Sequence, residues 1–366
     1  MVPPEVPSEE SRTPASKAPG PAGRWWWRVV AMLGGSGAVL VMAEVAVRVL
    51  GLGPQPFAPR VFEPHNAIPF MRIPNGPMAY RPNATFASIY DPAGDARDYF
   101  GPTGRVWYHI NSYGLRGPAI SVEKQPGSYR IVCLGDSLTF GEGVKYADTY
   151  PAQLRARLAG AMSDRTVEVV NAGVQAHATE DEAALYLLRC SQFQPDLVVL
   201  GFYLNDATDS HQTIRQNVEW TNSWAPSGLS SVSRLWDIFE RMRRGRQLQD
   251  EFLETTRASF DSPRWSDCKT ILQGMERISR EDGFRFVVVV FPVFWRLDGG
   301  YPFGEIHARI AVFCGEADIE FVDLLETYRN RSAESLWVHP TDRHPNEIAH
   351  RLAAERIADY LHTPAE

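Results

Sequence analysis

The chain has 366 residues, of which 44% are hydrophobic and 22% are charged, and its formal net charge is −7. This is the composition of a globular protein with room for one large domain or two smaller ones. The mild acidity offers no clustered basic face of the kind that binds nucleic acids, so no nucleic-acid partner is expected.

The N-terminal part of the chain divides into a polar tail and a long apolar segment. Residues 1–24 are rich in Pro, Ser, Ala and Glu, and we expect them to form a disordered tail. Residues 25–50 are predicted to form a single transmembrane helix that anchors the chain. The stretch from Val29 to Leu50 is apolar apart from Glu44 and Arg48 and has the length of roughly 20 residues that crosses a bilayer.

The residues that flank this segment predict its orientation. Lys17, Arg24 and Arg28 precede the apolar stretch, and the positive-inside rule therefore places the N-terminus in the cytoplasm and everything after residue 50 outside it. A cleaved signal peptide and a buried core helix are the alternatives. The length of the segment and the lack of an Ala-x-Ala cleavage site favour the uncleaved anchor in the cell membrane.

Residues 51–125 have little hydrophobic periodicity and are rich in Pro, Asn, Gly and Tyr. We interpret them as an extension that lifts the following domain from the membrane and packs on it. A strand followed by a turn is predicted only within residues 106–117.

From residue 126 to residue 363 apolar runs alternate with amphipathic stretches of helical length. Strands that are apolar throughout and alternate with helices predict a parallel sheet covered on both faces, in an α/β fold with three layers. The predicted strands are Tyr129–Leu134, Val167–Asn171, Leu197–Tyr203, Phe284–Phe291 and Ile319–Val322. The predicted helices lie near 148–162, 179–193, 266–282, 303–317 and 346–361.

Residues 207–265 interrupt this alternation. They contain four tryptophans and one predicted helix, 231–258. We interpret this segment as a helical insertion that covers one end of the sheet as a lid. Its tryptophans are expected mainly to pack, although contact with sugar or lipid is the alternative.

The four cysteines give no sign of a metal or redox motif. Cys133, Cys190, Cys268 and Cys314 are widely spaced and form no C-x-x-C pair. We therefore expect buried thiols, although an even number of cysteines also permits disulfides outside the cytoplasm.

Polar residues follow several of the predicted strands at the point where each strand ends. In an open parallel sheet these carboxyl ends share one edge, and ligands bind there. The residues in question are Gly135-Asp136-Ser137, Asn171-Ala172-Gly173, Asn205-Asp206, and Asp342 with His344 in the loop before the last helix. A hydroxyl, an imidazole, a carboxylate, a carboxamide and a backbone amide beside glycine are the groups that acyl transfer requires.

These segments resemble the conserved blocks of the SGNH/GDSL hydrolase superfamily. "GDSLTFG", "NAGV", "ND" and "DRHPN" occur in the order of that family, and the resemblance covers about residues 129–362. It implies a five-stranded, flavodoxin-like α/β/α sandwich and a serine enzyme. The implied nucleophile is Ser137, the base His344 and its orienting acid Asp342, while Ser137, Gly173 and Asn205 would form the oxyanion hole.

Two features depart from the family pattern. The acid lies two residues before the histidine rather than three, a spacing that resembles membrane-associated acyltransferase and esterase relatives. Tyr203 occupies the position two before Asn205, where glycine is usual. His339 competes with His344 for the role of base, but Asp342 and the following Pro-Asn favour His344.

The resemblance implies a serine esterase that removes O-acyl groups, acetyl among them, from a small-molecule, glycan or lipid substrate. An O-acyltransferase would use the same residues, and a non-catalytic glycan-binding or assembly protein could keep the same fold. No cofactor or metal is expected, and the sequence does not indicate an oligomeric state.

Overall fold

The computed structural model describes residues 21–51, 61–63, 69–207 and 228–362. Two units are distinguished in it. One consists of residues 1–55 with 226–243, and the other of residues 56–225 with 244–366. We describe the second unit first, because it contains the sheet.

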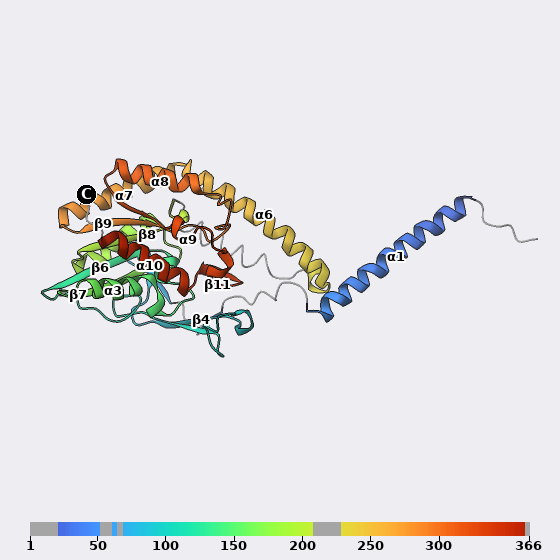
Figure 1. The fold of residues 1–366 in the computed structure, drawn as a ribbon, viewed down its shortest axis with the longest axis horizontal. Helices are drawn as coiled ribbons and strands as arrows, with labels where there is room; N and C mark the ends of the chain where they lie inside the picture. The colour runs from blue at the N-terminus through green and yellow to red at the C-terminus, as the bar shows by residue number, and fades with distance from the viewer. Residues whose placement is uncertain (1–20, 52–60, 64–68, 208–227, 363–366) are drawn as a thin grey trace, which may run out of the picture. The chain divides into compact units, whose positions relative to one another are not determined.

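A five-stranded parallel sheet forms the centre of this unit (Figure 1). Its strands lie in the order β10-β9-β8-β6-β7, which is the flavodoxin-like order that the family resemblance implies. Their bounds are β6 Ser128–Gly135, β7 Thr166–Gly173, β8 Leu197–Phe202, β9 Arg285–Val290 and β10 Glu320–Asp323. All five predicted strands are therefore confirmed.

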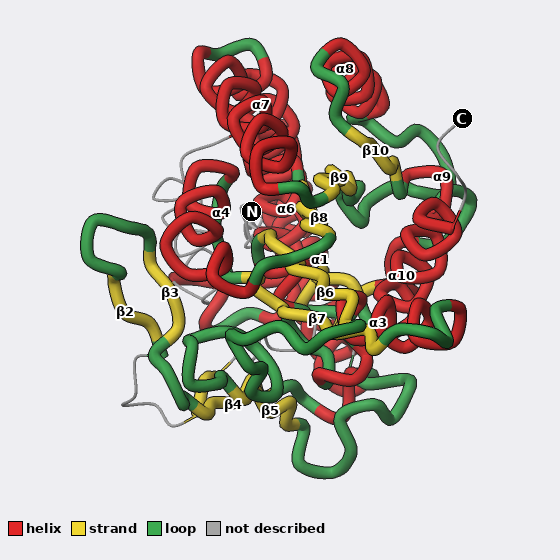
Figure 2. The backbone as a smooth tube through the Cα atoms, turned by 90° about the vertical axis from the view of Figure 1, so that its left-hand side faces the viewer, coloured by secondary structure: helices red, strands yellow, loops and turns green. Residues whose placement is uncertain are grey.

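Alternate residues of each strand pack into two separate hydrophobic clusters, one on each face of the sheet. Val132 and Leu134 of β6 point into one cluster, whereas Ile131 and Cys133 point into the other. Figure 2 shows helices on both sides of the sheet, which makes three layers. The first cluster is covered by α4 Thr179–Leu185, α7 Pro263–Asp282 and α8 Gly304–Glu316, and the second by α3 Tyr150–Ala161, α9 Leu325–Tyr328 and α10 Glu347–His362.

The predicted helix 179–193 is interrupted in the structure. After α4 the chain forms a π-turn at Tyr186–Cys190 and a 3-10 turn at Ser191–Phe193, and it then takes a positive φ of 49° at Gln194. The other predicted helices match α3, α7, α8 and α10 within three residues at each end. The remaining 3-10 segments are η1 Pro92–Gly94, η2 Tyr146–Asp148, η5 Leu204–Ala207, η6 Gly228–Ser231 and η7 Ala333–Leu336.

The extension contains more β-structure than the sequence predicts. An antiparallel sheet contains β1 Val61–Glu63, β4 Thr85–Ile89 and β5 Arg105–His109, and a hairpin of β2 Phe70–Arg72 and β3 Met78–Tyr80 lies between β1 and β4 in the chain. Its buried aromatic rings join the core of the parallel-sheet unit, since Tyr80 stacks on Phe140 with ring centroids 4.8 Å apart. The extension is therefore an integral part of this unit.

A buried guanidinium ties the extension to the main sheet. Arg116 is only 2% exposed, and it donates to the carbonyls of Phe140, Gly141 and Val144, the last two at 2.6 and 2.5 Å. The guanidinium also lies over the rings of Tyr108 and Phe140. A buried cation is stable only with such partners, so this contact fixes the turn that follows Ser137.

In the other unit, α1 spans Pro21–Val49, so the helix begins within the predicted tail. Its segment Trp25–Val49 is long and apolar enough to cross a membrane, with a mean hydropathy of 1.9 and none of it buried. A signal sequence would meet the same criteria. The insertion contains α6 Arg234–Phe260 where residues 231–258 were predicted, whereas residues 1–20 of the tail and 208–227 of the insertion lie outside the described residues.

Candidate active site

Ser137 lies in a tight turn between β6 and the short helix α2 Ser137–Phe140. Gly135 has a φ of +147°, and a Cβ atom there would lie 2.1 Å from Thr139 Oγ1, so only glycine fits this position. The Asp136 carboxylate then caps α2 by accepting from the backbone N–H of Leu138 at 2.8 Å. The turn leaves Ser137 half-buried at the carboxyl edge of the sheet.

Asp342 and His344 come from a hairpin of β11 Trp337–His339 and β12 Asp342–Pro345. His344 Nε2 lies 2.9 Å from Ser137 Oγ, and His344 Nδ1 lies 2.5 Å from Asp342 Oδ1. A carboxylate beside Nδ1 keeps the proton on that nitrogen, so Nε2 is left to accept the serine proton. The structure thus brings all three predicted residues into one hydrogen-bonded chain.

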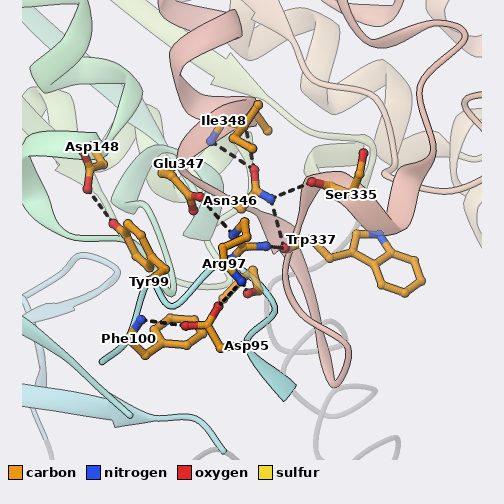
Figure 3. Close-up of polar contacts among 12 residues, drawn as sticks. Asp95, Arg97, Tyr99, Phe100, Asp148, Ser335, Trp337, Asn346, Glu347 and Ile348 are labelled. Carbon is orange, nitrogen blue, oxygen red and sulfur yellow. Dashed lines mark hydrogen bonds and ion pairs between the residues drawn. The ribbon is translucent and has the colours of Figure 1, made fainter. Parts of the chain in front are cut away.

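Side chains of Asn346 and Arg97 hold the β11–β12 hairpin at the end where β11 begins (Figure 3). The Asn346 amide donates to the carbonyls of Ser335 and Trp337, and its oxygen caps α10. From the extension, Arg97 donates to the carbonyl of Trp337 at 2.9 Å and lies 2.9 Å from a Glu347 oxygen. The extension therefore positions the strands that carry Asp342 and His344.

Tyr90 of the extension contacts Asp342 directly. Its hydroxyl donates to Asp342 Oδ2 at 2.8 Å, on the oxygen that does not face His344. The Tyr90 ring is buried and stacks on Phe100 with centroids 4.5 Å apart. Sequence reasoning missed this residue because Tyr90 lies 252 positions from Asp342 and outside every motif.

Asn205 lies in η5, directly after β8. The Asp206 carboxylate closes this turn by accepting from the N–H of Tyr203 at 2.9 Å. The Asn205 side chain is hydrogen-bonded to Asp136, and an amide can only donate to a carboxylate. The loops after β6 and β8 are therefore joined, and one amide donor of Asn205 is already used.

Three carboxyl groups are buried behind this edge of the sheet. Burial raises the pKa of Asp136 to about 6, while the N–H of Leu138, the charge of His344 and the Asn205 amide lower it. Burial, together with the neighbouring carboxyls, also raises the pKa values of Glu182 and Asp206 well above their usual range. Protonation of Glu182 and Asp206 prevents several like charges from being buried beside Asp136.

The structure gives the backbone N–H of Gly173 a partner within the protein. This N–H donates to Asn171 Oδ1 at 3.1 Å, because β7 is the edge strand of the sheet. A Cβ at position 173 would lie 2.1 Å from the backbone nitrogen of Phe140. The need for glycine here thus comes from the close approach of α2, and the amide does not point freely at a ligand.

Two further histidines, His339 and His177, have different surroundings. His339 is buried, with Nδ1 2.7 Å from Thr341 Oγ1 and Nε2 3.1 Å from the carbonyl of Asp91. His177 is 2% exposed and bonds to the carbonyl of Met78. Among the described residues, His344 is the histidine that is bonded to Ser137.

All four cysteines are buried and free, as expected from their spacing. Among the residues that the structure describes, no group of three or more His, Cys, Asp or Glu side chains could hold a metal ion.

Several solved structures have a similar fold. A two-domain esterase active on acetylated mannans, co-crystallized with mannopentaose, is 16% identical, with a TM-score of 0.41; the match covers 64% of this chain and 49%, about half, of that one. An acetylxylan esterase from Geobacillus stearothermophilus is 14% identical, with a TM-score of 0.43 and coverages of 66% and 98%. A putative lipolytic protein of the G-D-S-L family from Desulfitobacterium hafniense DCB-2 is 15% identical, with a TM-score of 0.37 and coverages of 63% and 99%.

The search of curated proteins finds no match to the sequence. A family model, by contrast, matches residues 133–352, more than half of the chain, and this range includes Ser137, Asp342 and His344. The protein therefore belongs to the GDSL-like lipase/acylhydrolase family and is a hydrolase that acts on ester bonds.

Proposed function

We propose that this protein is a serine esterase that removes O-acyl groups from its substrate through an acyl-serine intermediate. The observation that carries the proposal is the chain of hydrogen bonds from Ser137 Oγ to His344 to Asp342, at 2.9 and 2.5 Å. An unassisted serine hydroxyl is a poor nucleophile near neutral pH, and this chain supplies the base that it needs.

The proposed reaction has two steps. Ser137 Oγ attacks the ester carbonyl while His344 Nε2 takes the hydroxyl proton. The same proton then passes to the departing alkoxide, and the alcohol leaves. In the second step His344 Nε2 takes a proton from water, and the resulting hydroxide attacks the acyl-serine carbonyl. The bond to Ser137 Oγ then breaks, His344 returns that proton to Oγ, and the carboxylic acid is released.

Negative charge develops on the carbonyl oxygen in both steps, so hydrogen-bond donors are required beside Ser137. Ser137 is the first residue of α2, where a backbone N–H has no partner within the helix. We assign this N–H and the second amide hydrogen of Asn205 as oxyanion donors. Gly173 joins them only if its N–H exchanges Asn171 for the oxyanion. Loss of one such donor typically costs about 100-fold to 1,000-fold in kcat.

The place of the enzyme follows from α1. We propose that α1 anchors the chain in the membrane with the N-terminus in the cytoplasm and the hydrolase unit outside it. An active site in that compartment meets the acylated glycans and lipids of the cell surface. We therefore propose O-acylated carbohydrates or lipids as the substrates, with acetyl as the first acyl group to test.

The test uses the full chain in detergent or nanodiscs. Wild type, Ser137→Ala and the control Ser266→Ala, which changes an exposed serine of α7, are assayed with p-nitrophenyl acetate, acetylated oligosaccharides and a fluorophosphonate probe. We expect Ser137→Ala to lose both labelling and turnover while the control keeps both. Equal labelling and turnover in all three proteins would contradict the proposal. Product analysis with added glycan measures how the acyl group divides between water and a sugar hydroxyl.

A further inference from the structure

The two charged residues of the apolar segment both contact the start of α6. Glu44 Oε1 accepts from the backbone N–H of Arg234 at 2.8 Å, and Oε2 accepts from that of Leu235 at 2.8 Å. Arg48 lies 2.6 Å from Glu44 and donates to the carbonyl of Val232 at 2.6 Å. The Glu44 carboxylate therefore caps α6, because it satisfies N–H groups that have no partner within that helix.

Large apolar side chains are exposed just beyond this contact. They recur at spacings of three or four residues; two of them precede α6, and the three within α6 lie along one side of that helix. We call them the apolar stripe: Leu229, Val232, Trp236, Phe239 and Met242, which are between 42% and 69% exposed. An exposed apolar surface of this kind marks an interaction site.

The opposite side of α6 carries polar side chains that are largely buried. Asp237 and Arg241 form an ion pair at 2.9 Å, and their side chains are only 16% and 10% exposed. Basic side chains flank the apolar stripe instead, with Arg234 at its start and Arg243 at its end, both exposed. Aromatic and aliphatic side chains bordered by arginine are typical of helices that lie in the headgroup region of a bilayer.

We propose that the apolar stripe lies in the interface of the membrane that α1 crosses, on the side where Glu44 caps α6. The partner is the lipid surface itself. Two observations carry this inference: the continuity of the stripe with the end of the candidate span through Glu44 and Arg48, and the match of its flanking arginines to anionic headgroups. It rests on the membrane anchor of the proposed function and adds a second, lateral contact with the bilayer.

The test places a fluorophore at single positions of the full chain. Phe239→Cys is labelled with NBD and reconstituted in nanodiscs of phosphatidylcholine and phosphatidylglycerol at about 3:1, the anionic lipid being chosen to attract the arginines. The four native thiols are buried, so the introduced thiol alone reacts. Val312→Cys, an exposed apolar position of α8, is the matched control, and Leu40→Cys reports on the span.

We expect lipids with a quencher near the headgroup to quench the label at position 239 several-fold more than the label at 312. Quenchers at mid-chain depth should act on position 40. If position 40 is quenched while 239 behaves like 312, the inference is wrong and the anchor stands. If position 40 is not quenched either, the anchor fails, while esterase activity toward soluble esters is measured separately. Spin labels at 239 that couple between two copies would show a protein partner on the stripe and would also overturn the inference.

Discussion

Tyr90→Phe removes one hydroxyl, which donates to the Asp342 carboxylate of the proposed triad, and keeps the aromatic ring. The ring remains stacked on Phe100, so the packing of the extension is retained. The lost bond joins the Tyr90 hydroxyl to Asp342 Oδ2 at 2.8 Å. Because Asp342 orients His344, the loss should affect turnover more than the affinity for the substrate.

The size of the effect follows from what remains on Asp342. A hydrogen bond to a charged group contributes about 1.5–3 kcal/mol. Asp342 keeps two bonds to His344, from Nδ1 at 2.5 Å and from the backbone N–H at 3.1 Å, and its side chain is 10% exposed, so water replaces part of the loss. The lower end of that range, about 1.5 kcal/mol, corresponds to a fall in kcat of roughly tenfold.

The assay compares Tyr90→Phe with Tyr99→Phe. Tyr99 lies in the same extension and also donates to a carboxylate, that of Asp148 at 2.6 Å, outside the triad. We expect kcat for p-nitrophenyl acetate to fall in Tyr90→Phe with KM unchanged, and to stay near the wild-type value in Tyr99→Phe. Equal kcat values for the two variants would refute the argument that Tyr90 acts through Asp342.

Three further outcomes follow from the buried groups. Gly173→Ala should lower the melting temperature, because its Cβ would meet the Phe140 backbone nitrogen at 2.1 Å; thermal unfolding measures this, and an unchanged melting temperature would contradict it. Burial raises the pKa of Asp136 to about 6, so the stability that this group contributes is present below its unfolded pKa of about 4 and is lost as the pH rises through 6. Between urea titrations at pH 4 and pH 7, wild type should therefore lose more stability than Asp136→Asn, and an equal loss in both would show that Asp136 is not responsible. The four thiols are buried and burial raises their pKa values, so a thiol reagent should react only after denaturant is added, and rapid labelling of the native protein would disprove this.

The sheet could be predicted from the sequence because its strands are buried on both faces. Val198, Val199 and Leu200 of β8 are at most 2% exposed. The sequence of a strand that is buried on both faces is a continuous apolar run bounded by turn residues. The order of the polar blocks then places Ser137 and His344 at one edge of the sheet. The 2.9 Å distance between these residues agrees with that expectation.

The extension could not be predicted in the same way. Its strands β1 to β3 have three residues each, too few to show an alternating pattern. The contacts of Tyr90 and Arg97 with the hairpin join residues about 240 to 250 positions apart in the chain. No local signal indicates such a pairing, so the sequence predicts an extension that packs on the domain but not its contacts with the strands of Asp342 and His344.

Gly173 shows why a motif alone does not assign a role. A glycine at the end of a strand, in a block that by resemblance to the SGNH/GDSL superfamily would serve an oxyanion hole, can be required either by a ligand or by a neighbouring backbone. Here α2 approaches so closely that a Cβ would collide with Phe140, and the edge position of β7 leaves the Gly173 N–H to Asn171. Packing alone is therefore sufficient to require glycine at position 173. A donor role for its N–H would require the bond to Asn171 to break during the reaction.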